Sequence, residues 1–129
     1  MEIIQPSPES AADQVRALGA LARAATNSTA APQMAFLAAA QTRIFRTELD
    51  LDAVDSIEAA VLADHELDSK EARQLIRFMV VMCIADGPPS AQQMQLLESY
   101  AEALGVDEPA VGVIAHLAKG RELLFKLSF

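Results

Sequence analysis

One stretch of the chain, residues 68–87 (DSKEARQLIRFMVVMCIADG), limits more than any other what this sequence can fold into. It opens with a helix-capping pattern, Asp68 followed three residues later by Glu71, and it is wholly apolar over residues 78–85. A helix that is apolar on every side has to be surrounded by other helices. The sequence therefore predicts an all-α fold, a compact antiparallel bundle of about six helices around a central helix at about residues 68–86.

Helix-start patterns divide the rest of the chain. Ser7 and Pro8 form one such start, and Ser90 with Gln93 repeats the capping-box spacing before a helix that Gly105 would end. Strand-like alternation is not sustained anywhere in the sequence. Besides the central helix we expect helices at residues 8–25, 31–46, 52–63, between Ser90 and Gly105, and from Asp107 onward, joined by short loops.

The length of 129 residues fits a single domain, and 52% of the residues are hydrophobic. We interpret residues 1–129 as one helical domain with a flexible segment at residues 1–7. The ending RELLFKLSF is apolar for a terminus, and three interpretations stay open: it packs back on the bundle, it binds a partner, or more chain follows it. The apolar content favours a homo-oligomer.

The single cysteine, Cys83, lies within the apolar run, so no disulfide forms inside the chain. This predicts a reducing compartment, and a buried thiol of this kind is expected to be inert packing. The N-terminus lacks a basic segment followed by an apolar core, and no apolar run approaches the roughly 20 residues that cross a bilayer. We therefore expect a cytoplasmic protein without a membrane span.

The net charge of −8 comes from one part of the sequence, residues 47–71, in which only Lys70 opposes nine acidic residues. Such a band argues against binding nucleic acid or anionic membranes. It either attracts cations or a basic partner, or it is a solvated face that keeps an apolar-rich chain in solution. The nine acids are Glu48, Asp50, Asp52, Asp55, Glu58, Asp64, Glu66, Asp68 and Glu71.

The sequence contains no phosphate-binding glycine loop, no nucleophile elbow and no zinc-binding HExxH helix, so it predicts a non-enzymatic protein without a cofactor. The two histidines, His65 and His116, do not combine with Cys83 at zinc-ligand spacing. We expect His65 to be exposed in a loop and His116 to be partly buried in a helix. A calcium loop counted from Asp64 lacks the required glycine and glutamate, and one counted from Asp50 has Val54 at its fifth position.

Asp86 is the residue that this reasoning leaves open. A carboxylate at the end of a helix opposes the helix dipole, so something has to compensate for it. Either Asp86 has a structural role, capping the next helix or starting the Asp-Gly turn, or it binds a cation together with acids of residues 47–71.

The segment 67–106 resembles the TerB-like family of tellurite-resistance proteins. The resemblance lies in an apolar helix ending in Ala85-Asp86-Gly87, an acidic start of that helix, and a following capped helix that ends in Leu104-Gly105. It implies an all-α, non-enzymatic domain that acts in stress resistance through metal or protein association. By the same resemblance, a divalent cation would be held by Asp86, Asp64 and Glu71. The acid that the family carries seven residues after the aspartate is replaced here by Gln93.

Two hypotheses for function follow. The first is a TerB-like helical domain linked to tellurite or stress resistance through metal or protein association. The alternative is a helical module for protein–protein interaction or oligomerisation, with the apolar C-terminal segment as its interface. Both predict a protein partner or self-association and no nucleic acid.

Overall fold

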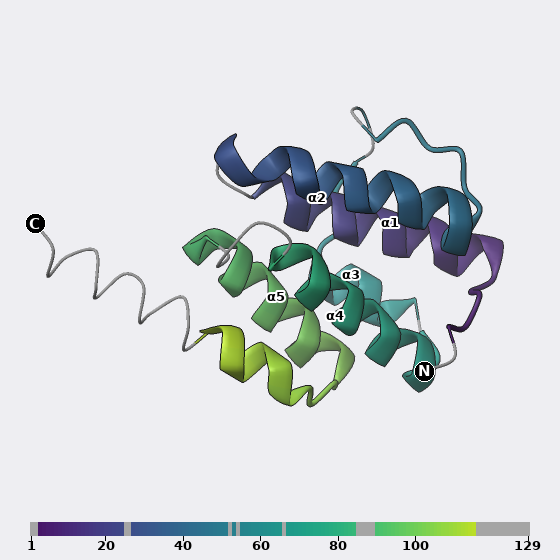
Figure 1. Ribbon diagram of the computed structural model, residues 1–129. Coiled ribbons are helices and arrows are strands. Elements are labelled where there is room, and N and C mark those ends of the chain that lie inside the picture. The colour runs from purple at the N-terminus through teal and green to yellow at the C-terminus, as the bar shows by residue number, and fades with distance from the viewer. Residues whose placement is uncertain are drawn as a thin grey trace, which may run out of the picture.

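The computed structural model describes residues 3–24, 27–51, 53, 55–65, 67–84 and 90–115, and within these ranges the chain forms helices and loops without a strand. The predicted all-α bundle is confirmed (Figure 1). A further helical segment runs over residues 109–115. The elements are α1 (Pro8–Arg23), α2 (Asn27–Ala40), the π-helical η1 (Gln41–Phe45), α3 (Ala59–Asp64), α4 (Ser69–Cys83) and α5 (Ala91–Leu104).

Helix α1 begins and lies where the sequence predicts. The Ser7 side chain accepts a hydrogen bond from the Ser10 amide and Pro8 occupies the first turn, so both start signals work as expected. The helix contacts α2, η1, α3, α4 and α5. Neighbours approach α1 from several sides, so much of the helix is buried. Its fully buried hydrophobic residues include Ala11, Val15, Ala17, Leu18 and Leu21.

Helix α4 is the predicted core helix. Asp68 caps it by accepting a 2.7 Å hydrogen bond from the Lys70 amide, and the helix packs against α1, α2 and α5. The Phe78 ring meets the rings of Phe36 and Phe45 edge to face, at centroid distances of 6.3 and 6.1 Å. These contacts join α4 to α2 and η1. Edge-to-face geometry is one that aromatic pairs favour.

Helix α2 differs from the expectation of residues 31–46. It starts at Asn27, so Pro32 lies inside the helix rather than in its first turn, and its last turn widens into η1. Gln41 explains how this end is held: its side-chain oxygen accepts hydrogen bonds from the Thr47 hydroxyl (2.8 Å) and the Leu49 amide (3.2 Å). The chain then turns through Arg46, which has a left-handed φ of 54°.

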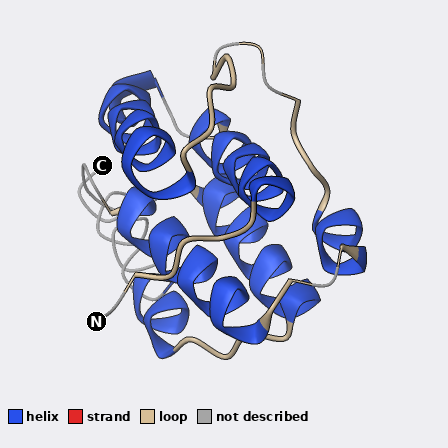
Figure 2. Cartoon of the chain, turned by 90° about the vertical axis from the view of Figure 1, so that its right-hand side faces the viewer, coloured by secondary structure: helices blue, strands red, loops and turns tan. Residues whose placement is uncertain are grey.

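The connection between η1 and α3 is long, contrary to the prediction of short loops and of a helix over residues 52–63. It forms an arch on the outside of the bundle (Figures 1 and 2). Side chains from other helices donate hydrogen bonds to backbone carbonyls of this connection, which would otherwise accept hydrogen bonds within a helix. Arg16 donates to the Asp55 carbonyl (3.1 Å), and the Tyr100 hydroxyl donates to the Ile57 carbonyl (2.5 Å). The helix therefore starts only at Ala59.

Helix α5 has both predicted ends. Ser90 and Gln93 form the complete capping box, and Gly105 ends the helix with φ of 68°. At the other end of the chain, Ile4 lies in the segment predicted to be flexible, yet it exchanges two 2.7 Å hydrogen bonds with the Gln74 side chain. Among the described residues, no helix is long and apolar enough to cross a membrane.

Candidate functional site

The three residues predicted to hold a divalent cation are not assembled by the part of the chain that the structure describes. Asp86 lies outside the described residues. Asp64 is exposed at the last residue of α3, while Glu71 is half-buried in the first turn of α4 and lines a pocket that Asp64 does not line. The described residues hold no group of three or more His, Cys, Asp or Glu that could bind a metal. The cation site stays a prediction.

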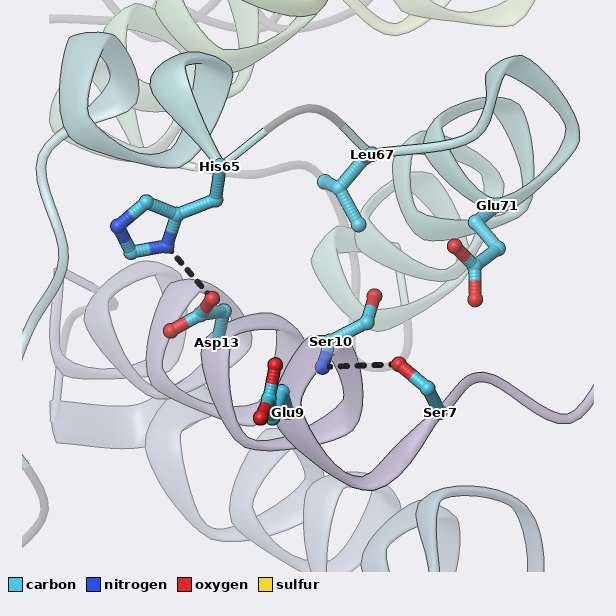
Figure 3. Close-up of a pocket in the computed structure, with 7 residues that line it drawn as sticks. All are labelled: Ser7, Glu9, Ser10, Asp13, His65, Leu67 and Glu71. Carbon is cyan, nitrogen blue, oxygen red and sulfur yellow. Dashed lines mark hydrogen bonds and ion pairs between the residues drawn. The ribbon is translucent and has the colours of Figure 1, made fainter.

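The pocket that includes Glu71 lies where the start of α1, the end of α3 and the start of α4 meet (Figure 3). Its volume is about 430 Å³. His65 and Glu71 stand on opposite sides of it, with Ser10 of α1 between them. The residues that line the pocket are Ser7, Glu9, Ser10, Asp13, His65, Leu67 and Glu71.

His65 pairs with Asp13 on one side of this pocket (Figure 3). The distance from His65 Nδ1 to Asp13 Oδ2 is 2.6 Å, and Arg16 Nη1 lies 3.7 Å from the other carboxylate oxygen. The His65 side chain is 44% exposed, as the sequence predicts, and pairs at this exposure contribute about 0–1 kcal/mol. Sequence reasoning missed the pairing because the two residues are 52 positions apart and share no motif.

The remaining carboxylates of the pocket have a structural explanation. Glu9 and Glu71 occupy the first turns of α1 and α4, where negative charge is stabilised by the helix dipoles. The Ser7 hydroxyl oxygen already accepts the hydrogen bond that caps α1. The N-termini of α1 and α4 thus meet at the pocket. Glu9 and Glu71 make it acidic because acidic residues are favourable in the first turn of a helix.

Gln93, which stands where the TerB-like pattern has an acid, is fully buried in the described structure. Its Nε2 donates to the Leu21 carbonyl (3.1 Å) and to Gln33 Oε1 (2.6 Å), and its Oε1 accepts from the Ser90 amide (3.2 Å). A carboxylate has no hydrogen to donate to the Leu21 carbonyl and would be a buried charge. An amide is therefore the group that suits this position, which joins α1, α2 and α5.

Cys83 is buried, with 1% of its surface exposed. Burial raises the pKa of its thiol from 9.0 to about 12, because the thiolate would lose its hydration. The prediction that Cys83 is inert packing agrees with this environment, since the thiolate is the reactive form.

One face of α4 is not covered by the other described parts of the chain, although the apolar sequence predicts a helix enclosed on every side. Val81 and Ile84 are 48% and 47% exposed. They continue a line of outward side chains at spacings of three and four residues, the spacing that places residues on one helical face. We call this line the α4 stripe; it consists of Lys70, Arg73, Arg77, Val81 and Ile84.

The basic half of the α4 stripe is electrostatically unfavourable within its own helix. Lys70 lies in the first turn of α4, where the helix dipole disfavours positive charge. Arg73 follows Lys70 by three residues and precedes Arg77 by four, and like charges at these spacings repel. Arg77 Nε lies 3.0 Å from Glu108 Oε2, whereas Lys70 and Arg73 make no ion pair among the described residues.

The sequence contains the signal for this stripe. The spacing of Arg73, Arg77, Val81 and Ile84 already predicts that all four share one face. Because the residues after Phe78 are apolar without interruption, periodicity alone did not distinguish the uncovered side of the helix from its buried sides.

Comparisons of this chain with protein-family models, with curated proteins and with solved structures find no match. The resemblance to the TerB-like family over residues 67–106 therefore stays a prediction. The pocket and the α4 stripe are the two candidate sites that a functional proposal has to weigh.

Proposed function

We propose that this chain is a helical interaction module that binds another protein through the α4 stripe. The observation that carries the proposal is the half-exposure of Val81 and Ile84, one turn apart at the end of the core helix. Most single exposed aliphatic residues need no explanation. Here Val81 and Ile84 are neighbours on the helix surface and continue a line of cations. The position of these cations lowers the stability of the helix. Unfavourable local interactions of this kind are characteristic of functional faces.

The energetics define what such a partner has to supply. Covering the exposed halves of Val81 and Ile84 would contribute about 1 kcal/mol each, half of the value for burying a whole aliphatic side chain. Micromolar binding requires about 8 kcal/mol net of the cost of association. The aliphatic pair is therefore an anchor, and the partner must also contact the polar part of the stripe.

The pocket beside His65 supports this proposal less well than the α4 stripe does. Glu9 and Glu71 are accounted for by the starts of α1 and α4, and the short hydrogen bond between His65 and Asp13 lies within the bundle. These interactions stabilise the chain itself. The exposed aliphatic pair of the stripe has no comparable role within the described bundle.

Site-specific photo-crosslinking tests the proposal. A photoreactive phenylalanine analogue replaces Val81 in the cells from which the chain derives, and in a matched control it replaces Ala39, an exposed residue of α2. We expect a discrete crosslinked protein at position 81 that is absent at position 39, and a lower yield when Ile84→Ser is added. Equal yields at positions 81 and 39 would overturn the proposal.

A further inference from the structure

We infer that the partner docks an amphipathic helix on the α4 stripe, with aliphatic residues over Val81 and Ile84 and acidic residues over Lys70 and Arg73. This inference rests on the proposed function and names the chemistry of the partner. It follows from the order of side chains along the stripe, which is cationic in its first half and aliphatic in its second.

Charge complementarity selects an acidic partner. The chain has a net charge of −8 and only 10 Lys and Arg residues, yet three of them, Lys70, Arg73 and Arg77, lie on this one stripe. Lys70 and Arg73 are exposed and make no ion pair among the described residues. Carboxylates of a partner would offset both the repulsion between these cations and their unfavourable position near the start of α4.

The geometry of the stripe selects a helix. From Lys70 to Ile84 the stripe rises about 21 Å, which is about four turns of helix, and it is one residue wide. A second helix presents side chains at the same spacing of three and four residues, so its own stripe can follow this one over the whole length. The acids of the partner then lie two to three turns from its aliphatic pair, as Arg73 and Lys70 lie from Val81.

Two other occupants fit the α4 stripe less well. A second copy of the stripe carries no acid and would bring cations against cations or against aliphatic residues. An anionic membrane would meet a chain whose nine acids within residues 47–71 repel it. An acidic helix of another protein complements both halves of the stripe.

A designed probe peptide tests the inference. The probe is a helical peptide of about 18 residues with two leucines one turn apart and glutamates two and three turns away on the same face, made in both sequence orders. Its binding to the full chain is measured by fluorescence anisotropy at low salt. We expect Arg73→Glu to weaken binding about tenfold, and Arg43→Glu, which changes an exposed base of η1 outside the stripe, to leave it unchanged. Circular dichroism verifies that both variants are folded.

Matched probes separate the possible outcomes. Replacing the glutamates of the probe by glutamine should weaken binding as much as Arg73→Glu does, and added salt should weaken it further. No binding by any probe, or binding that is indifferent to these charge changes, would overturn the inference. Binding of the chain to vesicles of anionic lipid in preference to the probe would overturn it in favour of a membrane. If crosslinking at position 81 succeeds in either case, the proposed function stands and only the partner chemistry fails.

Discussion

The variant Arg73→Glu should make the protein more stable, although it removes a residue of the proposed binding face. Arg73 repels Lys70 three residues before it and Arg77 four residues after it. Glutamate converts both repulsions into attractions. A repulsive pair costs, and an attractive pair contributes, about 0.2–0.5 kcal/mol, so each conversion is worth about 0.4–1 kcal/mol. Arginine and glutamate have similar helix propensity. Because Arg77 already pairs with Glu108, we discount the sum and expect the free energy of unfolding to rise by about 1 kcal/mol.

Urea unfolding followed by circular dichroism at low ionic strength measures this change. The expected gain corresponds to a rise of about 3–4 °C in the melting temperature. Arg73→Gln, which removes the charge without reversing it, should give about half of the gain, and 0.5 M salt should reduce both effects. We also claim that the cations of the α4 stripe lower the stability of the helix that carries them. If Arg73→Glu leaves the free energy of unfolding unchanged or lowers it at low salt, this claim is refuted.

Three further predictions concern the core and the helix ends. Gln93→Ala should destabilise the protein by about 2–4 kcal/mol in urea unfolding, because it leaves buried partners without hydrogen bonds, whereas Gln95→Ala on the exposed side of α5 should change it by less than about 0.5 kcal/mol. Burial raises the pKa of Cys83 from 9.0 and that of Tyr100 from 10.0, each to about 12. The unfolded chain therefore releases these protons first, so stability should be constant up to about pH 9 and fall towards pH 12; a flat profile would contradict the burial of both groups. The resemblance to the TerB-like family predicts that divalent cations raise the melting temperature and that Asp86→Asn removes the gain; no shift with the unchanged chain would count against a cation site.

The helix ends were the part of the fold that sequence specified best. The capping hydrogen bonds of Ser7, the Ser90–Gln93 pair and Gly105 join residues at most a few positions apart, so a short window of sequence contains each cap. The apolar run of α4 likewise predicted a core helix. These features are local or nearly so, and they establish the fold class.

The features that sequence did not predict depend on partners far away in the chain. The late start of α3 follows from Arg16 and Tyr100 binding the carbonyls of Asp55 and Ile57, and no pattern within residues 52–63 signals it. The pairing of His65 with Asp13 is of the same kind. The candidate site was missed for a different reason: uninterrupted apolar sequence predicts burial, but it does not tell which side of the helix the neighbours leave open.

The measurement that tests the central claim most directly is nuclear magnetic resonance of the ¹⁵N-labelled chain during titration with the acidic probe peptide. The claim is that α4 presents a docking face along the α4 stripe. We predict that the largest amide shift changes follow residues 70–84 with the periodicity of the stripe, and that Glu9, Asp13 and His65 on the other side of the pocket change little. Changes centred on that pocket or on α2, with α4 unaffected, would contradict the account.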